Sequence, residues 1–79
     1  MLLHVGYRNY VNKAKVLAIT EAKSQPMLRL RRNMDVDNKV IDCTENRKTI
    51  SLVHLEGGYI VLSAVSTEAL LARFTENRI

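Results

Sequence analysis

Residues 48–65, KTISLVHLEGGYIVLSAV, hold the clearest fold signal in the chain. Two segments with strand character, Lys48–Leu55 and Tyr59–Val65, flank the segment Glu56-Gly57-Gly58. Short runs rich in β-branched and aromatic residues on either side of a glycine pair predict two strands joined by a hairpin. This stretch therefore predicts an antiparallel sheet, to which the rest of the chain is added.

Further strands are predicted toward the N-terminus. They are marked by short apolar runs at Leu2–Val5, Val16–Ile19 and Lys39–Cys43. Gly6-Tyr7-Arg8-Asn9 follows the first run as a turn, because glycine and asparagine tolerate a left-handed backbone. Tyr7 and Tyr10 are thereby placed in a loop. Residues 44–47 join the third run to the hairpin, and Asn46 suits a positive φ in that tight connection.

Two helices complete the predicted domain. Ser24 or Gln25 as cap, with Pro26 in the first turn, predicts a helix that ends at Asp35. Ser66 is the predicted cap of a closing helix, whose expected buried stripe is Leu70, Leu71 and Phe74. The order ββαβββα indicates an α+β fold with a small, mostly antiparallel sheet of about five strands and two helices.

The chain is short for a self-sufficient domain. Its 79 residues fit one domain, 1–79, with little interior, and the single Cys43 excludes an internal disulfide. Two helices against one sheet enclose little, so a sheet face or edge is expected to meet another subunit. No apolar run approaches 18 residues and no charged leader precedes one, which favours a cytoplasmic protein without a membrane span.

Charge is distributed unevenly along the chain. Residues 1–34 hold seven cations and one anion, a net +6, whereas residues 35–79 hold five cations and seven anions, a net −2. Such asymmetry is typical of a protein that binds a polyanion. The candidate phosphate contacts are Arg8, Lys13, Lys15, Arg29, Arg31, Arg32, Arg47 and Lys48. Nucleic acid is one candidate partner, and an acidic protein bound by an adaptor is the other.

Catalytic and metal-site patterns are weak. His4 and His54 are fifty residues apart, and no histidine adjoins Cys43 in sequence. A Cys43–His54 pair formed in space is the one enzyme alternative, and a buried structural cysteine is favoured over it. We therefore expect a protein that is not an enzyme, with no metal, cofactor or small-molecule ligand. The helices are too far apart for a helix-turn-helix, and the strands lack the aromatic residues of an RNA-recognition sheet.

An ordered set of short motifs spans most of the chain. It comprises Gly6-Tyr7-x-Asn9 with Val11, Ile19, Ser24-x-Pro26, Ile41-Asp42-x-Thr44, Arg47-Lys48-Thr49, and Leu62-Ser63-Ala64-Val65 with Glu68 and Arg73. Taken together, from about Val5 to Phe74, these motifs resemble the RemA family, small bacterial regulators of extracellular-matrix (biofilm) genes. The resemblance implies a DNA-binding transcriptional activator with a fold like the LytTR domain. It also implies ring-shaped homo-oligomers around which double-stranded DNA bends.

The resemblance also places the DNA contacts. The family's contact positions fall on Lys15, Arg47 and Lys48, and Arg8 adds a charge where the family commonly has glycine. The family usually has arginine where Lys15 and Lys48 stand here. Lysine keeps the charge but lacks the planar fork that holds a phosphate with two hydrogen bonds. Because the sequence predicts no helix-turn-helix and no bidentate base reader on a long recognition helix, we expect weak sequence preference, with DNA selected by its deformability.

Overall fold

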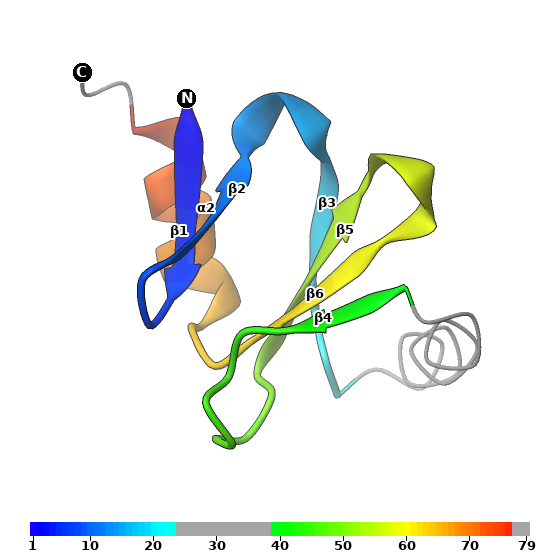
Figure 1. The fold of residues 1–79 in the computed structure, drawn as a ribbon. Helices are drawn as coiled ribbons and strands as arrows, with labels where there is room; N and C mark the ends of the chain where they lie inside the picture. Colours follow the sequence, from blue (N-terminus) through cyan, green and yellow to red (C-terminus); the bar gives the residue numbers. More distant parts are fainter. Residues whose placement is uncertain (24–38, 77–79) are drawn as a thin grey trace.

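The computed structural model of the chain describes residues 1–23 and 39–76 (Figure 1). Within these residues the chain forms six strands, two short 3₁₀ turns (η1 and η2) and one α-helix. In chain order they are β1 (Leu2–Gly6), β2 (Asn9–Asn12), η1 (Lys13–Lys15), β3 (Val16–Glu21), β4 (Val40–Asp42), β5 (Ser51–Leu55), η2 (Glu56–Gly58), β6 (Ile60–Ser63) and α2 (Thr67–Thr75). The α+β class is confirmed. The strand count is one higher than expected, and the strands form two sheets.

The larger sheet contains the hairpin that the sequence predicts. Its strand order is β3–β5–β6–β4, and β5 pairs antiparallel with β6. The connection between them, η2, places Gly57 and Gly58 at φ 83° and 81°, a region that other residues rarely adopt. β3 is antiparallel to β5, and β4 is parallel to β6. With the β1–β2 pair also antiparallel, the sheets are mostly antiparallel, as expected.

Two sequence-based expectations about the middle of the chain are wrong. The connection expected at residues 44–47 is longer in the structure, because residues 43–50 separate β4 from β5, and β6 lies between these two strands in the sheet. In addition, β5 begins at Ser51 and not at Lys48. The physical reason is the parallel pairing of β4, because the chain after β4 must pass β6 before it can enter the sheet. Residues 43–50 form that crossing, so Lys48 lies in a loop.

The smaller sheet is a hairpin of β1 and β2, in which Leu3 pairs with Val11 and His4 with Tyr10. The sequence predicts the turn at its tip but not β2 itself. The placement of Tyr10 in a loop is therefore wrong. The four residues of β2 contain two asparagines, which disfavour strands, and the pairing with β1 overrides that local preference.

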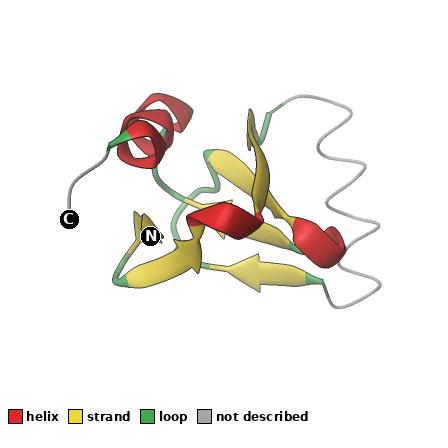
Figure 2. Cartoon of the chain, turned by 90° about the horizontal axis from the view of Figure 1, so that it is seen from above, coloured by secondary structure: helices red, strands yellow, loops and turns green. Residues whose placement is uncertain are grey.

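Two apolar clusters lie on opposite faces of the larger sheet. One contains Val53 and Val61 from the sheet, and the alternate residues Leu52 and Leu62 belong to the other, as the two-residue period of strands requires. The first cluster is completed by the β1–β2 hairpin and by α2, which packs against β1 and β3 (Figure 2). The buried Ser63 hydroxyl on β6 donates to the Val5 carbonyl on β1 at 2.7 Å and thereby links the β1–β2 hairpin to the larger sheet.

The closing helix begins where the sequence predicts. The Ser66 hydroxyl accepts a hydrogen bond from the Ala69 amide at 3.2 Å, which is an N-cap. Leu70 is fully buried and Phe74 packs on the first cluster, but Leu71 is 58% exposed, so its predicted place in the buried stripe is wrong. Leu70 and Phe74 are four residues apart and share a face, whereas Leu71 is turned about 100° away from Leu70. The predicted helix before Asp35 lies outside the described residues.

Candidate nucleic-acid interface

The β1–β2 turn holds two consecutive side chains in a left-handed conformation. Tyr7 and Arg8 have φ values of 49° and 64°, as a two-residue hairpin loop of the type I′ class requires. Asn9 stabilises the turn, because its side-chain amide donates to the Gly6 carbonyl at 3.0 Å. Both Tyr7 and Arg8 are exposed. The turn thus presents an aromatic ring and a cation next to each other at its tip.

A second tight turn precedes Arg47 and Lys48. The Asp42 carboxylate accepts hydrogen bonds from the Thr44 amide at 2.9 Å and the Thr44 hydroxyl at 2.6 Å. The Arg47 amide donates to the Thr44 carbonyl at 2.9 Å, which closes the turn. Asn46 has a φ of 63°, as expected from the sequence, and Glu45 has a φ of 52°. These contacts explain the Ile-Asp-x-Thr motif, which fixes the backbone that carries the two cations.

The Arg47 side chain is available to a partner. Asp42 and Glu45 are the acidic residues nearest to Arg47 in sequence and are therefore the first candidates for an ion pair with it. In residues 1–23 and 39–76 the Arg47 guanidinium makes no hydrogen bond or ion pair, and both Arg47 and Lys48 are exposed. A flexible cation held at a rigid backbone position suits contact with phosphate, where charge and reach matter most.

Both turns lie at the same end of the subunit. Gly6 is so close to the loop after β4 that a Cβ placed on it would lie 3.7 Å from the Cys43 carbonyl and 3.3 Å from Val65 Cγ2. In Figure 1 the turn of β1–β2 and the loop between β4 and β5 point toward the lower part of the view. We call this region the basic end, defined by Tyr7, Arg8, Arg47 and Lys48.

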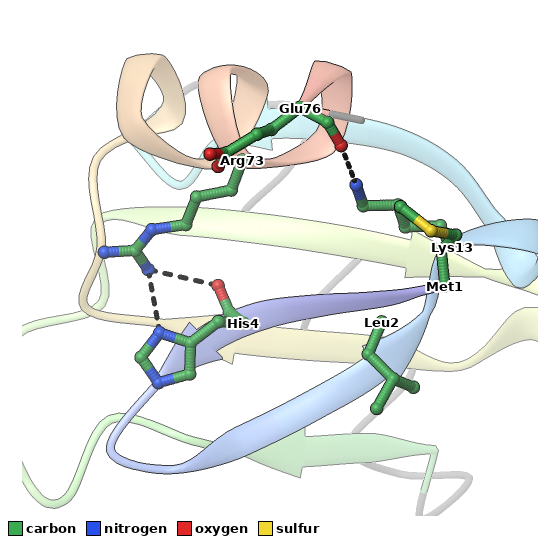
Figure 3. A pocket seen from close by; sticks show the side chains of 6 residues that line it. All are labelled: Met1, Leu2, His4, Lys13, Arg73 and Glu76. Carbon is green, nitrogen blue, oxygen red and sulfur yellow. Dashed lines mark hydrogen bonds between the residues drawn. The ribbon is translucent and has the colours of Figure 1, made fainter. Parts of the chain in front are cut away.

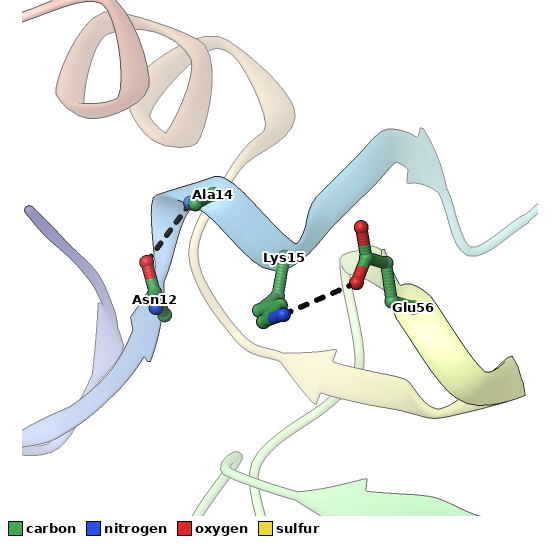
Figure 4. A network of polar contacts seen from close by, with 4 residues as sticks. All are labelled: Asn12, Ala14, Lys15 and Glu56. Carbon is green, nitrogen blue, oxygen red and sulfur yellow. Dashed lines mark hydrogen bonds and ion pairs between the residues drawn. The ribbon is translucent and has the colours of Figure 1, made fainter.

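Lys15 lies at the opposite end of the larger sheet. It precedes Val16, which pairs with Leu55 at the end of β5, whereas Lys48 precedes the start of β5. The four steps from Ser51 to Leu55, at about 3.4 Å each, put the two ends of β5 about 14 Å apart. Lys15 also forms an ion pair with Glu56 at 3.3 Å (Figure 4). Both side chains are more than half exposed, so the pair is weak and a phosphate could replace Glu56.

Lys13 has a different environment from the other candidate cations. Its ammonium group donates to the Glu76 carbonyl at 3.0 Å and lies 5.9 Å from the centre of the Phe74 ring. Arg73 donates to the His4 carbonyl at 3.1 Å in the same hollow (Figure 3). The hollow is lined by Met1, Leu2, His4, Lys13, Arg73 and Glu76. The two cations tie the C-terminal end of α2, which carries a partial negative charge, to β1 and η1.

This environment gives a prediction for Lys13. Lys13→Ala should lower the free energy of unfolding by about 1 kcal/mol, because a charged donor to the helix C-terminus is lost. In a domain of this size that corresponds to a fall in melting temperature of about 4–8 °C. Lys23→Ala removes the same charge from an exposed position and is the control. Equal melting temperatures for the two variants in calorimetry would contradict a structural role for Lys13.

Arg29, Arg31 and Arg32, the remaining candidate cations, lie outside the described residues. Among the described cations, the structure brings Arg8, Arg47 and Lys48 to one end and separates Lys15 and Lys13 from them. Tyr7 was not among the candidates from the sequence. The signal that could have identified it is the Gly-Tyr-x-Asn motif, since an aromatic residue inside a tight turn is unusual.

Cys43 and His54 do not form the pair on which an enzyme would depend. Cys43 is buried in the cluster with Val53, whereas the next residue along β5, His54, faces the other side of the sheet. His54 Nε2 forms a hydrogen bond with the Thr20 hydroxyl at 2.8 Å, and burial lowers the pKa of His54. Burial and the neighbouring Asp42 charge raise the pKa of the Cys43 thiol, which disfavours the nucleophilic thiolate.

In residues 1–23 and 39–76, no three His, Cys, Asp or Glu residues gather as a group that could hold a metal ion. Likewise, none of the helices in these ranges has the length and apolar character needed to cross a membrane.

Comparison with known proteins identifies the family. The family described as RemA-like, extracellular matrix regulatory protein A-like, matches residues 2–74. A protein of Thermodesulfovibrio yellowstonii is 36% identical over 80 residues, covering 100% of this chain and 94% of the relative. One from Nitratidesulfovibrio vulgaris (strain DP4) is 36% identical over 75 residues, covering 95% and 87% respectively. One from Thermotoga maritima is 36% identical over 76 residues, covering 96% and 83%.

All three relatives are named as candidate regulatory proteins. The match to the family covers nearly all of the chain, and each of these relatives is matched over most of its own length. The resemblance inferred from the ordered motifs is therefore confirmed, and this chain belongs to the RemA-like family.

Proposed function

We propose that this chain is a DNA-binding transcriptional regulator of extracellular-matrix genes that acts in the cytoplasm as a ring-shaped homo-oligomer. The observation that carries the proposal is the basic end. There Arg47 and Lys48 project from a turn whose backbone is fixed by Asp42 and Thr44. Membership of a family named for matrix regulation supports the target genes, and the regulatory names of the relatives support the class of function.

Self-association is supported by the surface of the larger sheet. β3 and β4 are its outer strands within the described chain, so each presents an unpaired edge. Leu17 on β3 is 68% exposed, Leu71 on α2 is 58% exposed, and Ile41 on β4 is also exposed. Apolar surface at two different edges of one sheet favours a head-to-tail contact between copies. A head-to-tail contact closes into a ring when the rotation between copies permits it.

A ring-shaped assembly also explains why a small number of cations in each subunit is enough to bind DNA. The basic end supplies three cations from each subunit, which alone is weak binding. Repeated around a ring, these contacts act together on one duplex, and their effects multiply. Lys15 adds a second row of cations at the other end of β5, a strand about 14 Å long. DNA that follows such a curved surface must bend, so easily deformed sequences bind best.

The test is a titration of a labelled 40-base-pair duplex at two salt concentrations. Neutralised phosphates release counterions, so affinity should fall by about a thousandfold or more between about 50 and 200 mM salt. A duplex rich in flexible TA steps should bind more tightly than a stiff duplex of equal length. Affinity that is the same at both salt concentrations would contradict phosphate contact. No DNA binding, together with salt-sensitive binding of polyglutamate, would favour the adaptor that recognises an acidic protein.

A further inference from the structure

Tyr7 differs from the other two tyrosines in having no ring or cation beside its own ring within residues 1–23 and 39–76. The Tyr10 ring lies 5.0 Å from the His4 ring, and the Tyr59 ring lies 5.9 Å from the Lys39 ammonium group. Among the residues that the structure describes, the Tyr7 ring contacts no other ring or cation and its hydroxyl makes no hydrogen bond. Tyr7 is 46% exposed, between Tyr59 at 44% and Tyr10 at 57%, so the difference from the other tyrosines lies in its contacts and not in its exposure.

The backbone holds Tyr7 in this position at a cost. Its φ of 49° lies in the left-handed region, where a bulky aromatic residue is strained and where asparagine or glycine is preferred. Strained backbone of this kind is concentrated at functional sites. Neither the geometry of the turn nor packing in the core requires a tyrosine at position 7, so the tyrosine side chain needs another explanation.

The neighbours of Tyr7 indicate what its ring could contact. Arg8 follows it directly, and the loop of Arg47 and Lys48 lies at the same end of the subunit. An aromatic side chain set among cations suits a ligand in which phosphates flank an apolar surface. The grooves of duplex DNA have this arrangement, because the phosphates lie on either side of the sugars and bases. The minor groove is about 6 Å wide, which admits a single aromatic side chain but not a strand pair.

We propose that Tyr7 is a further DNA-contacting residue, whose ring enters the minor groove as an apolar wedge at a base step while the nearby cations hold the flanking phosphates. The inference rests on the proposed DNA binding. A wedge partly unstacks the step and bends the duplex, and pyrimidine–purine steps such as TA yield most easily. Tyr7 is therefore the residue that sets the preference for deformable DNA, whereas the cations set the salt-dependent affinity.

The test uses Tyr7→Asn in the full chain, because asparagine suits the left-handed backbone and should keep or raise the melting temperature. We expect about a tenfold loss of affinity for a TA-rich duplex and a smaller loss for a stiff duplex, as a wedge requires. The slope of affinity against salt should not change, because no cation is removed. Tyr7→Phe should retain the wild-type preference, since the ring and not the hydroxyl forms the wedge.

Tyr10→Ala removes the same kind of ring from the same hairpin and is the matched control. If wild-type protein binds DNA and Tyr7→Asn binds each duplex with the same affinity as wild type does, the wedge is wrong and the DNA-binding function stands. If wild-type protein binds neither duplex, the proposed function and the wedge both fall. If Tyr10→Ala loses the TA preference to the same extent as Tyr7→Asn, the effect belongs to the hairpin and not to Tyr7, which also overturns the inference.

Discussion

Replacement of Arg47 and Lys48 by alanine is expected to remove most DNA binding while the fold and the assembly persist. Both side chains are exposed, and Arg47 makes no polar contact within the described part of the chain, so the melting temperature should change by less than about 4 °C. Each subunit loses its contacts with phosphate, and the loss repeats at every subunit that touches the duplex. We expect at least a hundredfold weaker binding and a shallower dependence on salt, measured by fluorescence anisotropy.

Two controls separate charge from geometry in this experiment. Arg47→Lys keeps the charge but loses the planar fork, so it should weaken binding far less than alanine does. Lys39→Ala removes one charge at the other end of β5, where its ammonium group donates to the Gly57 carbonyl at 3.2 Å, and should weaken binding far less. Should the alanine double variant elute as a smaller species in size-exclusion chromatography, or bind DNA as wild type does, the role given to these two cations would be wrong.

The parts of the fold that could be predicted are those that short sequence segments determine. The glycine pair at 57–58 specifies the β5–β6 hairpin, and Ser66 specifies the start of α2, because in both cases the responsible side chain or φ is local. The parallel pairing of β4 with β6 joins segments about twenty residues apart in sequence. No local sequence pattern specifies that β4 pairs with β6 and not with β5, the next strand along the chain. For the same reason the separate β1–β2 sheet was not anticipated.

The candidate site shows the same division. Exposure of Arg47 follows from its place after a tight turn, which the sequence indicates. Lys13 and Lys15 are two residues apart with equal charge, yet Lys13 holds the end of α2 while Lys15 faces Glu56. That difference depends on which elements pack beside η1, and therefore on tertiary structure. Cation spacing along the chain predicts which side chains are candidates, but not which of them are already used to stabilise the fold.

Leu17→Glu is expected to dissociate the assembly and, through it, to abolish tight DNA binding. Val16 pairs with Leu55 and Ala18 with His54, so Leu17 is the extra residue of a β-bulge on an outer strand. A bulge of this kind redirects a side chain, so the contact proposed at this edge is made by side chains and not by added strand pairing. Leu17 is directed outward and borders an apolar hollow with Leu71 and Phe74. A buried, unpaired carboxylate in a contact between copies costs far more than one in water, so the contact should not form.

The same substitution is harmless to an isolated subunit, because Leu17 is mostly exposed there and contributes little to the core. Light scattering of Leu17→Glu at tens of micromolar should therefore give the mass of one folded chain, and wild-type protein should give a mass larger than a dimer. Leu2→Glu, at a similarly exposed position on β1, is the matched control and should leave the assembly intact. DNA affinity should fall in Leu17→Glu although every cation remains, because a single subunit keeps only its own few phosphate contacts. A Leu17→Glu protein that keeps the wild-type mass would place the contact elsewhere, and a wild-type monomer would remove the basis for additive binding altogether.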